Sequence, residues 1–130
     1  ELLYNAVYYG VKNMDGEHKE EWNTNFELKE GEVEVHYGSD GEKYGVAVVD
    51  HGGRLSKASI LHWLSRQIVK DEEGRPVGLL DTHGRGLFIS RIYGDRMIVN
   101  IERNRRTEII SLNYIGKAFE GAKPLLINEI

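Results

Sequence analysis

The sequence predicts an α+β domain, a two-layer sandwich in which helices cover one face of a mixed, mostly antiparallel sheet. Three observations lead to this prediction. The chain has 130 residues, which is enough for one domain of ordinary size and not comfortably enough for two. Its apolar residues change along the chain between the spacing of a helix and that of a strand. Strand-like segments come in two pairs, each joined by a short turn, so we expect a single domain over residues 1–130.

The first predicted element is a helix. Apolar residues at helical spacing predict a helix over residues 1–9 that ends near Gly10. Residues 11–25 are polar and irregular, and we interpret them as a surface connection with a helical turn around residues 18–22. The first residues already have the pattern of a helix interior, with no cap and no leader. We therefore expect the chain to be a piece whose N-terminal part, upstream of Glu1, is missing.

The rest of the chain alternates strands and helices. Residues 32–37 alternate with a period of two and residues 44–49 run apolar, which predicts a hairpin whose second strand is more buried. Ser56 can cap the helix that follows. The later elements are expected as a helix over 56–69 with the apolar face Ile60, Leu61, Leu64 and Ile68, a charged loop over 71–78, a short helix over 87–93, strands over 96–101 and 107–112, and a short strand or helix at 125–127.

Composition and charge exclude several classes of protein. Hydrophobic residues make up 40% of the chain and charged residues 29%, which is typical of a globular protein. The formal net charge of −4 argues against a dedicated nucleic-acid binder, whose surface is basic. The chain has no cysteine and no apolar run that could span a membrane, so we expect no thiolate site, no membrane partner and a cytoplasmic location. Its 15 glycines are a larger share of the 130 residues than the usual ~7%, which indicates sites that need backbone without side chains.

Three separated segments carry residues suited to chemistry. Glu1 and Asn5 lie one helical turn apart, so a carboxylate and a carboxamide share a face and could polarise a hydroxyl or ligate a hard cation. Asp50 ends a buried strand just before Gly52, where a carboxylate can accept a hydrogen bond from an exocyclic amine. The glycine loop 84–87 leads into a helix, where free amides form an anion seat. Alone, each segment is also explained as a solvated face, a strand-ending turn or a glycine-rich cap.

Taken in order, the three segments resemble the N, G1 and G2 boxes of the histidine-kinase-like ATPase superfamily, also called GHKL or the Bergerat fold. Residues 1–6 are similar to its Glu-x-x-x-Asn-Ala box, residues 50–52 to its Asp-x-Gly, and residues 84–87 to its Gly-x-Gly-Leu. The resemblance covers residues 1 to about 113. It is closest to the anti-sigma-factor serine/threonine kinase branch, because the first box begins with Glu1 and the third reads Gly-Arg-Gly-Leu-Phe.

The resemblance implies a role for each matching residue. ATP and Mg²⁺ would be the cofactors, with Asn5 as the magnesium ligand. Glu1 would be the general base that orients the attacking hydroxyl group. Asp50 would bind the adenine amine, with Thr107 and a water beside it, and Gly52 would leave room for the base.

The same resemblance implies a phosphate seat and a lid. The phosphates would lie on the amides of four successive residues, Gly84, Arg85, Gly86 and Leu87. Residues 51–83 would form the ATP lid, and we expect its loop 70–78 to be mobile. The sequence departs from the family at Arg54, where the second glycine of the G1 box is expected. This arginine could fill part of the adenine pocket or reach a phosphate.

The function implied is that of an ATP-dependent serine/threonine protein kinase of the anti-sigma type. It would transfer the γ-phosphoryl group to a small antagonist protein in bacterial regulation. Its partners would be this antagonist or a sigma-factor-like protein, and the missing N-terminal part would form a homodimer. Two alternatives stay open. One is a nucleotide-gated interaction module without catalysis, and the other is the catalytic domain of a sensor histidine kinase, which the long lid and Glu1 disfavour.

Two smaller features have competing interpretations. Trp63 lies off the apolar stripe of its helix, and we favour packing under the lid over a partner surface. Arg103, Arg105 and Arg106 cluster in a turn between two predicted strands. We favour a solvated turn over a binding patch for these three arginines.

Overall fold

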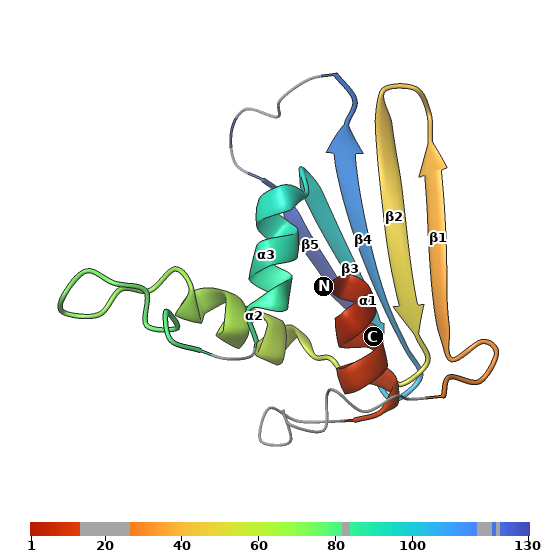
Figure 1. Cartoon of the computed structure of the whole chain (residues 1–130), viewed down its shortest axis with the longest axis horizontal. Coiled ribbons are helices and arrows are strands. Elements are labelled where there is room, and N and C mark those ends of the chain that lie inside the picture. The colour runs from red at the N-terminus through yellow and green to blue at the C-terminus, as the bar shows by residue number, and fades with distance from the viewer. Residues whose placement is uncertain (14–26, 82–83, 117–120, 122) are drawn as a thin grey trace.

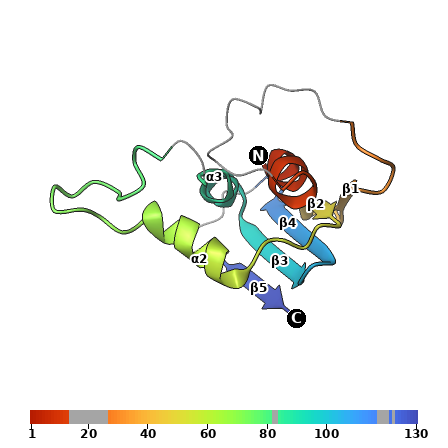
Figure 2. The ribbon, with the colours of Figure 1, turned by 90° about the horizontal axis from the view of Figure 1, so that it is seen from below.

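The protein has two layers, with helices on one face of a sheet. A computed structural model describes residues 1–13, 27–81, 84–116, 121 and 123–130. Within these residues the sheet has five strands, and the N-terminal helix, α2 and α3 all lie on the same side of it (Figure 1 and Figure 2). The predicted α+β architecture with a mixed, mostly antiparallel sheet is therefore confirmed.

The sheet consists of two hairpins and a tail strand. Its strands are β1 (Val33–Ser39), β2 (Lys43–Asp50), β3 (Arg96–Glu102), β4 (Arg106–Tyr114) and β5 (Leu125–Glu129). They lie in the order β1-β2-β4-β3-β5, and every neighbouring pair is antiparallel except β3 and β5. Both predicted hairpins are confirmed, and β2 is more buried than β1, as expected. The pairing of β2 with β4 places Asp50 directly opposite Thr107.

The N-terminal helix continues further than predicted and changes its winding. α1 spans Leu2–Asn5, and a π-helix, η1, follows over Ala6–Val11. The amide of Lys12 donates to the carbonyl oxygen of Val7 at 2.9 Å, and this five-residue spacing marks the wider turn. Gly10 lies inside η1 and is buried, and the helix ends one residue later, at Val11, close to the predicted end near Gly10. The glycine permits a close contact with the end of β2.

The second helix is shorter than predicted. α2 spans Lys57–Arg66, and the side chain of Ser56 caps it by accepting a hydrogen bond of 3.1 Å from an amide of the first turn. The predicted end at residue 69 was wrong. The chain turns back after Gln67, because the buried side chain of this residue donates to the carbonyl oxygen of Gly78 at 3.1 Å.

The hydrophobic core lies between the helices and the central strands. α3 spans Gly86–Tyr93 and ends at Gly94, as predicted. The buried core residues are Ile60, Leu64, Leu87, Met97, Val99, Ile101 and Ile109. The apolar stripe predicted for α2 is only partly right, because Leu61 and Ile68 are 49% and 57% exposed. α2 lies beside the edge strand β5 and reaches the core with a narrow face (Figure 2). The helical turn predicted around residues 18–22 lies outside the described residues.

Candidate functional site

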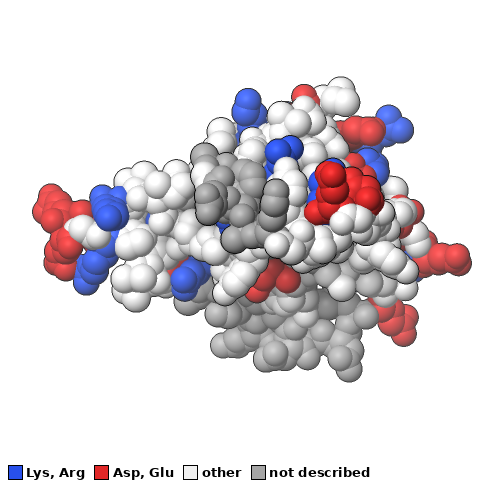
Figure 3. Space-filling view, turned by 90° about the horizontal axis from the view of Figure 1, so that it is seen from above, with Lys and Arg blue, Asp and Glu red and all other residues white. Residues whose placement is uncertain are grey.

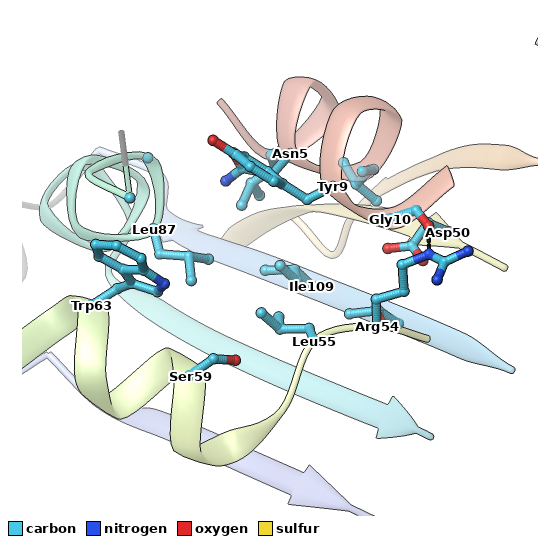
Figure 4. Close-up of a pocket in the computed structure, with 16 residues that line it drawn as sticks. Asn5, Tyr9, Gly10, Asp50, Arg54, Leu55, Ser59, Trp63, Leu87 and Ile109 are labelled. Carbon is cyan, nitrogen blue, oxygen red and sulfur yellow. Dashed lines mark hydrogen bonds between the residues drawn. The ribbon is translucent and has the colours of Figure 1, made fainter. Parts of the chain in front are cut away.

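A cavity between the N-terminal helix, α2, α3 and the sheet brings the three sequence segments together (Figure 4). Most of its walls are apolar. Six of the predicted site residues line it: Asn5, Asp50, Gly84, Gly86, Leu87 and Thr107. The other three, Glu1, Gly52 and Arg85, are not among the lining residues. Segments that lie far apart in the sequence therefore meet around one space.

Asp50 is the buried carboxylate of this cavity. It is the last residue of β2, and only 6% of its surface is exposed. Its Oδ1 accepts hydrogen bonds from the amides of Gly52 at 2.9 Å and Gly53 at 3.2 Å. Burial raises the pKa of Asp50 above its ordinary value, and the two amide hydrogen bonds oppose this rise. Because both amides bind Oδ1, the second oxygen, Oδ2, remains as an acceptor for a group in the cavity.

Thr107 carries a buried hydroxyl group and lies next to this carboxylate. The residue pairs with Asp50 across β2 and β4, so the two side chains project from the same face of the sheet. Thr107 is 2% exposed, and within the described part of the chain its buried Oγ1 has no hydrogen-bond partner. An unpaired buried hydroxyl group costs about 1–3 kcal/mol. The floor of the cavity therefore offers an acceptor and a donor side by side.

The first and third segments meet at Gly86. A Cβ atom at this position would lie 2.6 Å from Oε2 of Glu1 and 2.9 Å from Nδ2 of Asn5, so the close approach depends on the missing side chain. Glu1 is exposed and Asn5 is half-buried. The carboxylate and the carboxamide that were predicted to share a helix face thus both lie against the start of α3.

Gly84 and Arg85 lead into α3, at the segment predicted to bind the phosphates. Gly84 has a φ of +78°, which glycine adopts without strain, and a side chain there would overlap the ring of Trp63. Among the described residues no side chain caps the N-terminus of α3, so its first amides are available to a ligand. Arg85 is the exposed N-cap residue. Trp63 is half-buried and its ring packs against Gly84, which favours a packing role over an exposed partner surface.

Sequence reasoning missed Gly10 as a site residue. A Cβ atom at Gly10 would lie 2.5 Å from Cγ of Asp50, so the carboxyl group packs directly on the bare backbone of η1. Gly52, predicted to leave room for a base, is equally tight, because a side chain there would overlap the carbonyl oxygen of Gly10. No local pattern signals such a contact, since its partner is distant in the sequence.

The two residues after Gly52 make different contacts. Gly53 has a φ of +58° and packs on the turn between β3 and β4, where its Cβ atom would lie 2.5 Å from the carbonyl oxygen of Glu102. Arg54 lines the cavity, and its Nε donates to the carbonyl oxygen of Gly10 at 3.0 Å. Figure 4 shows Arg54 beside Asp50, at the end of the cavity away from α3. Arg54 therefore lies nearer to the buried carboxylate than to the start of α3.

The predicted lid, residues 51–83, contains α2 and an arm formed by residues 66–81 that projects beyond it (Figure 1). Arg66 closes the base of the arm with two hydrogen bonds to Asp81, of 2.8 and 2.9 Å. Within the arm, the amide of Val77 donates to the carbonyl oxygen of Val69 at 2.8 Å. The tip carries charges of both signs (Figure 3). The loop expected to be mobile is thus a short hairpin closed by an ion pair.

The arginine turn between β3 and β4 lies away from the cavity lining. Arg103 and Arg105 are exposed, and within the described ranges they form long ion pairs, with Glu129 at 3.4 Å and Glu102 at 3.5 Å respectively. Arg106 is half-buried and pairs with a glutamate of its own strand at 2.7 Å. This arrangement agrees with a solvated turn.

Comparisons with known proteins add no family to this geometry. No protein-family model, curated protein or solved structure matches the chain. In the residues that the structure describes, no three His, Cys, Asp or Glu side chains gather into a metal-binding cluster. Over the same ranges, no helix has the length and apolar character needed to cross a membrane. The arrangement of the cavity residues is the basis on which a function can be proposed.

Proposed function

We propose that the chain is an ATP-binding domain of the histidine-kinase-like (GHKL, Bergerat) type and that it serves a serine/threonine protein kinase of the anti-sigma type. One observation carries the proposal. Asp50 and Thr107 lie opposite each other at the floor of the cavity, and among the described residues neither Oδ2 of Asp50 nor Oγ1 of Thr107 has a hydrogen-bond partner. These are the two positions that the sequence resemblance assigns to the adenine base.

The chemistry of adenine matches this pair of groups. Adenine presents an exocyclic amine beside a ring nitrogen, that is, a donor next to an acceptor. Oδ2 of Asp50 would accept from the amine, and Oγ1 of Thr107 would donate to the ring nitrogen directly or through a water. The apolar side chains of Leu55 and Ile109 line the same cavity and would cover the base. Guanine carries a carbonyl oxygen where adenine carries its amine, so it would face the carboxylate of Asp50 unfavourably.

The other end of the cavity is suited to phosphates. The uncapped amides at the start of α3 favour an anion. Gly84 and Gly86 let Trp63, Glu1 and Asn5 pack directly on the backbone there, so these side chains surround the proposed seat. A magnesium ion would neutralise the phosphate charge. Asn5 supplies the kind of oxygen that Mg²⁺ prefers, and it lies next to Gly86, so the donor set fits this ion.

Glu1 adds a carboxylate beside the proposed phosphate seat. Because its Oε2 lies against Gly86, Glu1 is well placed to act on a hydroxyl group that approaches the γ-phosphate. As general base it would accept the proton of a substrate serine or threonine while the hydroxyl oxygen bonds to the γ-phosphorus and ADP leaves. Phosphoryl transfer needs positioning and charge neutralisation above all, and these residues offer both. The substrate would be a small antagonist protein, and the partner that it releases a sigma-factor-like regulator.

Calorimetric titration with ATP and Mg²⁺ tests the proposal. We expect Asn5→Ala to weaken binding of ATP with Mg²⁺ and to leave binding of adenosine nearly unchanged, because Asn5 lies at the phosphate end. Asn113→Ala, which changes an asparagine of β4 that does not line the cavity, is the matched control. Equal ATP affinity in the Asn5 variant and the control would refute the role of Asn5, and no ATP binding by the unaltered protein would refute the proposed function.

A nucleotide-gated interaction module without catalysis is the second candidate. It is favoured by Arg54, which occupies one end of the cavity beside Asp50 where the resemblance leads one to expect glycine. Both candidates bind ATP, but only the kinase loses phosphotransfer in Glu1→Ala while it keeps its ATP affinity. Acid stability of the phosphorylated product is a further criterion. A phosphoserine or phosphothreonine survives acid, whereas an acid-labile product would indicate a sensor histidine kinase.

A further inference from the structure

We propose that Arg54 is a positioning residue that fastens the helix carrying Asn5 to the loop carrying Asp50. The inference rests on the proposed function, because it assigns the base and the phosphates to the two ends of the cavity. In this role Arg54 sets the distance between the two ends, although it contacts neither the base nor the phosphates itself.

A hydrogen bond from a charged donor links the two segments. Nε of Arg54 donates to the carbonyl oxygen of Gly10 at 3.0 Å in partly buried surroundings. Hydrogen bonds with an ionised donor are stronger than those between neutral groups. Gly10 lies in the last turn of η1, and Arg54 follows the end of β2. The bond therefore joins the end of the N-terminal helix to the loop that begins at Asp50.

The N-terminal helix and the loop after β2 pack closely against each other at Gly10. Its backbone packs on the carboxyl group of Asp50, since a Cβ atom at Gly10 would lie 2.5 Å from Cγ of that residue. Gly52 packs on the carbonyl group of Gly10 and leaves no room for a side chain. Gly10 and Gly52 thus let the two backbones approach closely, and Arg54 joins them through its hydrogen bond to the carbonyl oxygen of Gly10.

The last turn of η1 depends on the hydrogen bond between Arg54 and Gly10, which we call the anchor. The final carbonyl groups of a helix have no partner within the helix, so the carbonyl oxygen of Gly10 needs a hydrogen-bond donor from outside η1. π-helical turns are rare, occur mostly as short segments, and are frequent at functional sites. Without Arg54, the last turn of η1 would lose this charge-assisted hydrogen bond to the loop after β2. We expect such a turn to open more often than one that is held by a charged side chain.

Loss of the anchor should affect Asn5 and Asp50 differently, because they belong to different elements. Asn5 belongs to the same continuous helix as Gly10, so its position against Gly86 depends on the anchor. Asp50 also packs on Gly10, but its pairing with Thr107 and two amides of its own loop hold it independently of the anchor. Loss of Arg54 is therefore expected to disturb the phosphate end of the cavity more than the base end.

Hydrogen exchange without nucleotide tests the anchor directly. In Arg54→Met, which keeps most of the aliphatic stem and loses the donor, we expect the amides of residues 6–12 to exchange at least about tenfold faster, because the opening of this turn is no longer opposed by a charge-assisted hydrogen bond. Arg105→Met is the matched control, because Arg105 is exposed and does not line the cavity. Unchanged exchange of residues 6–12 in Arg54→Met would overturn the inference.

Calorimetry with two ligands then tests the positioning role. We expect Arg54→Met to weaken binding of ATP with Mg²⁺ about tenfold, the loss of one charge-assisted hydrogen bond, and to change adenosine affinity less than about twofold. Arg54→Lys keeps a charged donor and should recover most of the ATP affinity. Equal losses for both ligands would overturn the inference and indicate that Arg54 acts on the base. If the unaltered protein binds neither ligand, the proposed function fails together with this inference.

Discussion

Replacing Thr107 with valine is expected to stabilise the free protein and to weaken nucleotide binding. The exchange keeps a β-branched side chain of similar size in β4 and removes the hydroxyl group. Thr107 is 2% exposed, and among the described residues its Oγ1 has no partner. Because an unpaired buried hydroxyl group costs about 1–3 kcal/mol, its removal should raise the free energy of unfolding by at least about 1 kcal/mol.

The same substitution removes the donor proposed for adenine. One hydrogen bond to a neutral group is worth about 0.5–1.5 kcal/mol, so the affinity for ATP should fall about 3- to 10-fold. Thermal unfolding with and without ATP and Mg²⁺ measures both effects. We expect Thr107→Val to raise the melting temperature of the free protein by about 3–6 °C. Added ATP should raise the melting temperature of this variant less than it raises that of the unaltered protein.

Ser56→Ala provides the contrast, because it removes a hydroxyl group that accepts a hydrogen bond in the free protein. It should lower the free energy of unfolding by about 1 kcal/mol, as expected for the loss of a helix cap. If Thr107→Val lowers the stability of the free protein as Ser56→Ala does, the hydroxyl group of Thr107 has a partner there. The inference that this hydroxyl group is unpaired in the free protein and binds a ligand would then be refuted.

Two further predictions concern Asp50 and Gly10. Burial raises the pKa of Asp50 in the folded protein, so the ionised form costs stability once the pH rises above the ordinary carboxyl range, and this cost disappears as the pH falls below it. A ligand amine bound to the carboxylate favours its ionised form, so adenosine should lower the pKa of Asp50 in a carboxyl NMR titration, and an unchanged pKa would argue against contact with the amine. Gly10→Ala should lower the free energy of unfolding by about 1–3 kcal/mol in urea, because its Cβ atom would lie 2.5 Å from Cγ of Asp50. Gly38→Ala is its control, since no atom lies within 4 Å of the added Cβ atom, and equal stability of the two variants would show that Gly10 has room for a side chain.

The strands were predictable because their signals are local. Alternation over 32–37 and the apolar run over 44–49 predicted the first hairpin, and the structure places β1 and β2 over the same segments. The end of α2 was not predictable in this way. Ile68 and Val69 continue the apolar composition of the helix, but the chain turns back where Gln67 binds the carbonyl oxygen of Gly78. A tertiary hydrogen bond thus overrides a local pattern.

The cavity shows the same division between local and distant information. Asp50 at the end of a buried strand and the glycines before α3 are visible as sequence patterns. The pairing of Asp50 with Thr107 depends on β2 lying next to β4, which joins two separate hairpins and which periodicity cannot reveal. Gly10 was interpreted as a helix end because its partner, the carboxyl group of Asp50, is distant in the chain. Contacts that create the site are therefore the part that local reasoning misses.

ATP binding by the unaltered protein and by Asp50→Asn tests the central claim most directly. Both proteins are titrated with ATP and Mg²⁺ by calorimetry at neutral pH, and circular dichroism verifies that the variant keeps its fold. Loss of a hydrogen bond to a charged acceptor costs about 1.5–3 kcal/mol, so the affinity should fall about 10- to 150-fold in Asp50→Asn. Binding of ATP with the same affinity in both proteins, or no binding in either, would contradict the account of Asp50 as the residue that holds the base.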